Sequence, residues 1–113
     1  MSGQNLNING VEYAQVRKMS TNRVIIRADR SGVHFGTIKS RTGSEVVLAD
    51  SRRLWYWDGA ASLSQMAVDG VSAPANCKFS VRVPEITVLG VCEIIPCSEA
   101  AVTSIEAVKE WKR

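Results

Sequence analysis

Short β-branched runs separated by turn-forming residues recur along the first half of the chain. The run 24–26 is followed by turn formers at 28–32, and the extended run 33–38 is followed by a turn at 41–44. A third run, 45–49, comes directly after that turn. Because each turn can reverse the chain between two runs of strand propensity, the pattern predicts a meander of three antiparallel strands.

The second half continues the β pattern with interruptions. Polar residues at 50–53 are expected to interrupt the third strand before a new extended piece at 54–57. Residues 79–83 alternate between apolar and polar, as a half-buried strand does. Residues 86–95 are almost continuously apolar and predict one longer or two shorter core strands, which Pro96 is expected to end.

Two helices are predicted from capping residues and apolar spacing. Ser62 is placed as the N-cap of a short helix with apolar residues at 63, 66 and 67, and Gly70 as its terminator. Ser98 can cap a second, C-terminal helix. Its apolar stripe consists of Val102, Ile105 and Val108.

These elements predict an α+β fold with a β-rich single domain over residues 10–113. We expect six or seven mostly antiparallel strands in a compact sheet or a barrel-like arrangement, with a short middle helix and a C-terminal helix. Residues 1–9 are rich in Asn and Gly, and we expect them to form a flexible N-terminal segment.

Charge is distributed unevenly, although the formal net charge is only +3. Residues 17–53 balance at +6, whereas residues 54–113 balance at −2. A field of one sign in one half of a small domain attracts anions, and the modest total suits a small compact anion better than a long polyanion. The alternative is that these basic side chains are solvated residues on strand faces.

Few residues are suited to metal, redox or hydrolytic chemistry. His34 is the single histidine, the three cysteines (77, 92 and 97) lack the CxxC spacing, and the carboxylates are scattered singly. We therefore expect reduced thiols, no metal, no cofactor and a protein that is not an enzyme; the alternative is a small enzyme that acts on a nucleotide. The chain has no run of about 18 apolar residues and begins with a polar segment, so we expect an intracellular protein with no membrane partner.

The segment 52–57 is the most informative stretch, because two arginines precede three consecutive aromatic residues. Strand alternation predicts Arg53, Trp55 and Trp57 on one face, and Arg52, Leu54 and Tyr56 on the other. Guanidinium groups bind phosphate and indole rings stack on nucleobases, so the segment could cradle a nucleotide. The alternative is that one face fills the core while arginine stacks on tryptophan at the surface.

A second candidate group surrounds the first predicted turn. His34 stands between Gly32 and Gly36, small residues that permit close approach of a ligand. Its imidazole could bind a ribose hydroxyl when neutral or a phosphate when protonated; a structural or exposed histidine is the alternative. Arg27 and Ser31 flank the same turn and could line the same anion site.

Five segments carry a resemblance to a known family: 32–37, 45–48, 52–57, 59–63 and 93–97. They resemble a family of small tailed-bacteriophage proteins of unknown function, over about residues 22–111. The Arg-Arg-x-Trp-x-Trp motif at 52–57 and the Ile-Ile-Pro-Cys motif at 94–97 are its most specific parts. The resemblance implies a phage accessory protein made in the host bacterial cytoplasm, and analogy with other small phage proteins suggests a role against host defence.

Together these observations predict a protein that binds and sequesters an anionic nucleotide signal, such as a cyclic dinucleotide or an ADP-ribose derivative. A pocket for such a ligand usually needs about 300–1,000 Å³, and a β-rich domain of this size has little interior for it. We therefore expect the pocket between copies in a homo-oligomer. The alternative is a structural or regulatory phage protein that binds single-stranded nucleic acid or a host protein. The candidate ligand-binding residues are Arg27, His34, Arg52, Arg53, Trp55 and Trp57.

Overall fold

The computed structural model describes residues 7–8, 11–12 and 18–113. β1 (Asn7–Ile8) and β2 (Val11–Glu12) pair antiparallel with each other. The flexible segment expected at residues 1–9 falls mostly on residues outside this part of the chain. That expectation and the domain boundary at residue 10 therefore stay predictions.

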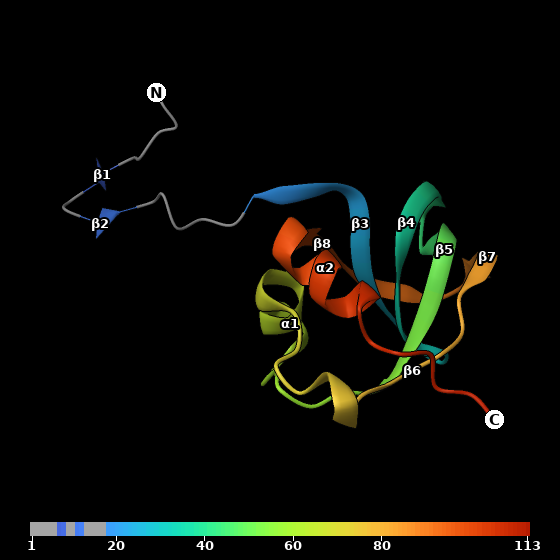
Figure 1. Ribbon diagram of the computed structural model, residues 1–113. Coiled ribbons are helices and arrows are strands. Elements are labelled where there is room, and N and C mark those ends of the chain that lie inside the picture. Colours follow the sequence, from blue (N-terminus) through green and yellow to red (C-terminus); the bar gives the residue numbers. More distant parts are fainter. Residues whose placement is uncertain (1–6, 9–10, 13–17) are drawn as a thin grey trace.

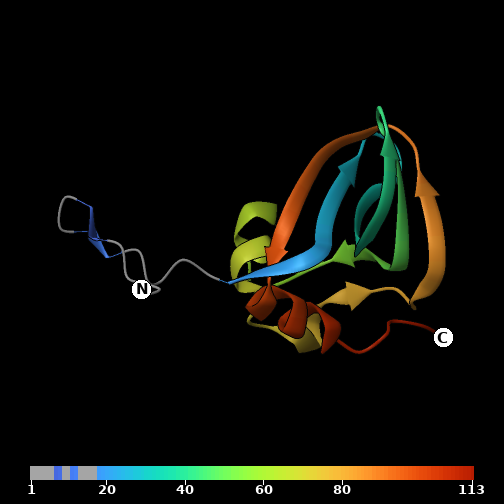
Figure 2. The same cartoon turned by 90° about the horizontal axis from the view of Figure 1, so that it is seen from above.

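Six of the described strands form one curled antiparallel sheet, and two helices lie together on one side of it (Figures 1 and 2). The strands follow the order β6-β5-β4-β3-β8, and β7 pairs with β5 beside β6. The expected β-rich α+β fold is confirmed. The elements are β3 (Met19–Ala28), β4 (Gly32–Thr42), β5 (Glu45–Tyr56), α1 (Leu63–Asp69), the 3₁₀ turn η1 (Pro74–Asn76), β6 (Lys78–Phe79), β7 (Val83–Val88), β8 (Val91–Ser98) and α2 (Glu99–Glu106).

The predicted meander is confirmed in β3, β4 and β5. Gly32 and Gly43 occupy the two turns with φ of +88° and +59°, a backbone conformation that glycine adopts without steric cost. A further contact closes the curl, because the Val91 N–H donates to the Ser44 carbonyl over 2.9 Å. The tip of the β4–β5 hairpin thereby meets the start of β8.

The predicted interruption at residues 50–53 is wrong, since β5 runs without a break from Glu45 to Tyr56. The pairing of β5 with β4 shifts by one residue between Phe35 and Thr37, and Asp50 takes a φ of 52° at that point. This is a β-bulge, in which an extra polar residue bends the strand and leaves it continuous. Gly36 lies opposite, where an added Cβ would meet the Ala49 carbonyl oxygen at 3.1 Å.

Two further strand predictions need correction. Of the predicted strand 79–83, Ser80–Arg82 lie outside any strand, because Ser80 Oγ accepts the Arg53 N–H and the Glu110 carboxylate accepts the Arg82 N–H. Pro96 does not end the last strand; it lies inside β8, which is at the sheet edge, where the missing N–H costs no ladder bond. The apolar run 86–95 divides into β7 and β8, which confirms the alternative of two shorter strands.

Both helices begin where their caps predict. Ser62 Oγ accepts the Gln65 N–H over 3.1 Å at the start of α1, and Gly70 ends that helix with a φ of +77°. Ser98 Oγ accepts the Ala101 N–H over 3.0 Å at the start of α2. Within the described ranges, no helix is long and apolar enough to span a membrane.

The sheet is apolar on both faces, so the molecule has two cores. The helix-side core lies between the sheet and the helices and includes Ile25, Phe35, Leu54, Met66, Phe79 and Ile105. The inner core fills the curl of the sheet and includes Val24, Ile26, Val46, Leu48 and Val88. Neighbouring residues of one strand therefore serve different sides, and this division places the candidate site residues.

Candidate anion-binding site

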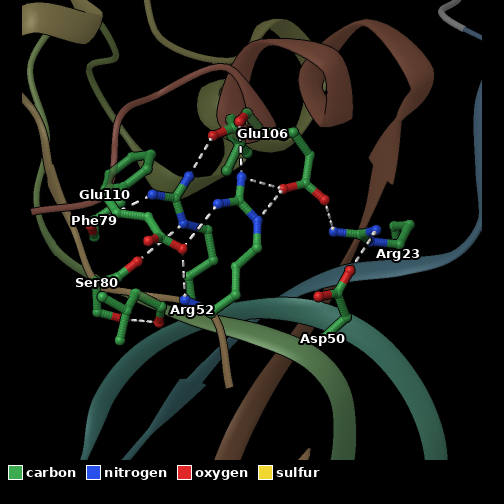
Figure 3. A network of polar contacts seen from close by, with 10 residues as sticks. Arg23, Asp50, Arg52, Phe79, Ser80, Glu106 and Glu110 are labelled. Atoms are coloured by element: carbon green, nitrogen blue, oxygen red, sulfur yellow. Dashed lines mark hydrogen bonds and ion pairs between the residues drawn. The ribbon is translucent and has the colours of Figure 1, made fainter. Parts of the chain in front are cut away.

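Arg52, one of the predicted ligand-binding residues, is a structural residue of the helix side. It is only 1% exposed, and its guanidinium donates to the carbonyls of Ile105 (2.9 Å), Ser80 (3.2 Å) and Phe79 (3.4 Å) (Figure 3). These bonds tie β5 to α2, to β6 and to Ser80, which follows β6. Arg52 therefore lies where a ligand in solution does not reach it.

The aromatic residues of the segment are also separated. Trp57 follows the end of β5 and packs against the helix-side core, so the prediction that it shares a face with Arg53 and Trp55 is wrong. Strand alternation does not extend past Tyr56, which explains the error. Trp55 is 63% exposed and lies outside the residues that line the cavities described below.

Arg27 lies apart from the rest. Its side chain is exposed on β3, and its Nε donates to Glu93 Oε1 on β8 over 3.1 Å. The same carboxylate would compete with an anionic ligand for this guanidinium. Of the six predicted residues, the structure brings together only His34 and Arg53.

His34 and Arg53 lie directly opposite each other on β4 and β5. Both line a cavity of about 230 Å³, together with Ser51, Ser80, Val81, Val83 and Ile86. Directly opposed side chains of an antiparallel pair have Cβ atoms about 4.5–5.5 Å apart, so the imidazole and the guanidinium are close neighbours. Ser31 Oγ lies 2.9 Å from His34 Nε2, within hydrogen-bond distance.

The environment keeps His34 neutral near pH 7. Burial and, to a lesser degree, the positive charge of Arg53 lower the pKa of His34 from 6.5 to about 4, against the opposing effect of its hydrogen bond with Ser31. The neutral imidazole can therefore form a hydrogen bond with a hydroxyl group, as donor or as acceptor. The positive charge at this place belongs to Arg53.

The guanidinium of Arg53 has neither a hydrogen bond nor an ion pair within the described chain. Arg23 and Arg52, by contrast, both have partners. The Nε of Arg53 is shielded from solvent without an acceptor, which is costly because a buried donor loses its water. An anionic oxygen placed beside it would supply the missing acceptor.

Arg53 also lines a second, larger cavity of about 460 Å³. Its walls are the β3–β4 turn and the β7–β8 hairpin, and the lining residues are Asp29, Arg30, Ser31, Arg53, Ile86, Thr87, Val88, Leu89 and Gly90. The two arginines outnumber the one carboxylate. The apolar side chains of the hairpin supply a surface on which a flat ring can lie.

Sequence reasoning missed the hairpin 86–90 and Ser80 as parts of this site. An apolar run broken at Gly90 indicates a strand reversal, but no local signal says that the reversal faces Arg53. The curl of the whole sheet brings them together. Cys77 and Cys97 are buried and Cys92 is exposed, all three as free thiols, and no group of His, Cys, Asp and Glu in the described ranges could hold a metal ion.

Comparison with known proteins gives a family without an assigned activity. A family model described as a domain of unknown function, DUF6948, matches residues 21–105. The match includes both strands that carry His34 and Arg53 and most of the two helices. Searches of curated proteins and of solved structures found no match to the chain.

Proposed function

The chain belongs to the DUF6948 family, whose function is unknown, and we propose from its own geometry that it binds and sequesters a small nucleotide-type anion at Arg53. The observation that carries the proposal is the guanidinium of Arg53, which lacks a partner and lines two adjoining cavities. An arginine shielded in this way gains most from a ligand that brings its own negative charge.

The two cavities suit different parts of a nucleotide. The smaller one is lined by the neutral imidazole of His34 and the hydroxyls of Ser51 and Ser80; His34 and Ser51 are each only 1% exposed, so a ribose would have to open this cavity to bond them. The larger one offers an apolar wall at Ile86 and Leu89 for a base. A phosphate would lie between them on Arg53. A cyclic dinucleotide or an ADP-ribose derivative contains all three groups.

A homo-oligomer is part of the proposal. Leu89 is 64% exposed at the rim of the larger cavity, and a large apolar side chain at a pocket rim is well placed to contact a second copy. A dinucleotide exceeds what one open cavity of about 460 Å³ encloses. Closure by a second chain would shield the ligand from competing proteins.

The biological setting is proposed from the resemblance to small tailed-bacteriophage proteins. In that setting the chain is a phage accessory protein in the host bacterial cytoplasm, where removing a nucleotide signal would weaken host defence. The second candidate function is binding of single-stranded nucleic acid or a host protein by the segment 52–57. It is less supported, because Arg52 and Trp57 belong to the helix side.

Isothermal titration calorimetry against cyclic dinucleotides, ADP-ribose derivatives and mononucleotides tests the proposal. We expect one member to bind and Arg53→Gln to weaken it at least tenfold, as loss of a charge-assisted contact of about 1.5–3 kcal/mol implies. Arg41→Gln is the matched control, since Arg41 is exposed and bonds only its own turn at Gly43. Absence of binding across the whole panel would refute the proposal.

Mass spectrometry of small molecules released from the purified protein tests the same proposal without choosing a ligand. We expect an intact nucleotide from the wild-type protein and none from Arg53→Gln. If the protein is then incubated with the nucleotide so identified, recovery of a cleaved product would indicate an enzyme and would contradict sequestration.

A further inference from the structure

The end of the chain lies beside β6 and forms an exposed aromatic and basic surface. Tyr56, 52% exposed, pairs with Lys78 in the β5–β6 register. Lys78 Nζ lies 5.5 Å from the centre of the Trp111 ring, and Trp111 is 46% exposed. We call Tyr56, Lys78, Lys109 and Trp111 the tail surface. Large exposed aromatic groups on adjoining segments are a feature of binding surfaces.

The tail surface is held in place by a network of ion pairs. Arg82 donates to the carboxylates of Glu106 (2.8 Å) and Glu110 (3.2 Å), and Arg23 on β3 also pairs with Glu106 (Figure 3). The backbone N–H of Trp111 donates to the Phe79 carbonyl over 2.8 Å. The segment that carries Trp111 is therefore fixed to the sheet before any ligand arrives.

A cavity of about 530 Å³ adjoins the Trp111 ring. Pro74, Ala75, Cys77 and Ala107 line it together with Lys109 and Glu110. This lining is mostly apolar, as the binding of a planar ring requires. The volume falls in the range of sites that take small organic molecules, about 300–1,000 Å³.

The charge around the cavity is positive, although residues 54–113 balance at −2 overall. Lys78, Lys109, Lys112 and Arg113 are exposed, whereas the nearby carboxylate of Glu110 is taken up by Arg82. Hydrogen bonds from the backbone and side chain of Arg82 lower the pKa of Glu110, so it stays ionised and paired. Glu106 and Glu110 are thus paired with Arg82, and among the described residues neither Lys78 nor Lys109 forms an ion pair with a carboxylate.

We propose that the tail surface is a second binding site, separate from Arg53, and that it takes a single-stranded nucleic acid. One base would stack on Trp111 in the cavity and the next on Tyr56, while the phosphates contact Lys78 and Lys109. Base stacking on fixed aromatic rings together with a row of cations is the general chemistry by which proteins bind single strands. A purely apolar partner would leave Lys78 and Lys109 without a counter-charge.

Fluorescence anisotropy with labelled oligothymidylate and oligouridylate, on the full chain at several salt concentrations, tests the proposal. We expect binding at low salt, with log K against log[salt] falling at a slope of about −1.4, as the two phosphate contacts at Lys78 and Lys109 on a single strand imply. Trp111→Leu should weaken binding about tenfold, and Trp111→Phe should restore part of it. The two oligonucleotides distinguish DNA from RNA as the preferred source.

Charge variants make the test independent of any loss of packing at Trp111. Lys78→Glu changes an exposed side chain, should weaken binding more than tenfold and should make the salt slope less steep. Lys39→Gln, at an exposed position of β4 where Lys39 pairs with Glu85, is the control for a lost cation elsewhere, and Lys78→Gln is its match in charge. Absence of binding at low salt, or equal loss in Lys39→Gln and Lys78→Gln, overturns the proposal. Loss in Arg53→Gln with full binding by Trp111→Leu overturns it too and assigns the oligonucleotide to the Arg53 site.

Discussion

At the scale of single residues, the two adjacent arginines of β5 have opposite roles. Arg52 spends its guanidinium on three carbonyl oxygens of the protein, whereas that of Arg53 has no partner in the described chain. Arg52 thus stabilises the fold on one face of the strand, whereas Arg53 is a candidate ligand contact on the other. Substitutions at the two positions should affect different measurements.

Arg52→Met is expected to destabilise the fold by about 2–4 kcal/mol. The change removes three hydrogen bonds of a buried guanidinium and leaves the Ser80 carbonyl without its donor, while the Phe79 and Ile105 carbonyls keep backbone donors; losing a buried charged contact is costly. Urea unfolding followed by circular dichroism measures the effect. Arg27→Met removes an exposed arginine with one ion pair and should cost less than about 1 kcal/mol. Equal costs for the two variants would contradict the structural role of Arg52.

His34 should make the stability depend on pH. Its pKa is about 4 in the folded chain and near 6.5 when unfolded, so the unfolded chain binds the proton first as the pH falls. The contribution of His34 is therefore complete above pH 6.5 and decreases as the pH falls from 6.5 to about 4. Unfolding midpoints across this range should decline for the wild type and decline less for His34→Gln.

The pKa itself can be measured, since His34 gives the only histidine ring signal in an NMR titration. Arg53→Gln removes the neighbouring positive charge and should raise the pKa of His34 above about 4. A pKa near 6.5 in the wild-type protein would show that the imidazole is not buried beside Arg53.

At the scale of elements, the β-bulge in β5 decides how the strand bends. Asp50 has a φ of 52°, in the left-handed region that Asp, Asn and Gly tolerate and β-branched residues do not. The polar residues 50–53 therefore lie at a bend inside β5, although the sequence pattern predicted that the strand would be interrupted there. The capping serines show the opposite case, because one local hydrogen bond is enough to define each helix start.

Substitutions at Asp50 test the bulge. Asp50→Val should destabilise the protein by about 1–3 kcal/mol, because a β-branched side chain is strained at this φ. Asp50→Asn keeps the conformation while removing the charge, and its cost should stay below about 0.5 kcal/mol, since the carboxylate lies 3.9 Å from Arg23 and is largely exposed. Thermal unfolding measures the loss of stability in the two variants. Equal losses would contradict the bulge at Asp50.

At the scale of the whole molecule, the curl of the sheet assembles what no local pattern contains. The sequence was sufficient for the meander, the helix caps and the opposite facing of Arg52 and Arg53, since these depend on short-range rules. It was insufficient for Trp57, which leaves the strand, and for the β7–β8 hairpin, which reaches Arg53 only through the closed shape of the sheet. Long-range closure, set by packing in the inner core, decides those placements.

The proposed homo-oligomer is tested at the same scale. Leu89→Glu should shift the sedimentation of the protein toward the monomer without lowering its thermal stability by more than about 0.5 kcal/mol, because the side chain is mostly exposed. Val68→Glu, at an exposed position of α1, is the control and should leave the sedimentation unchanged. A wild-type chain that sediments as a monomer at all concentrations would contradict the oligomer.

The extra residue at the bulge has one more consequence. Val46 and Leu48 point into the curl, and uninterrupted alternation would send the even-numbered Arg52 there as well. The added residue reverses the parity of β5, so that Ser51 and Arg53 enter the cavity and Arg52 turns to the helices. The bulge thus decides which arginine faces the cavity: a regular strand that kept the extra residue would turn Arg52 inward, whereas deleting one residue near Asp50 would remove the bulge and leave Arg53 facing inward.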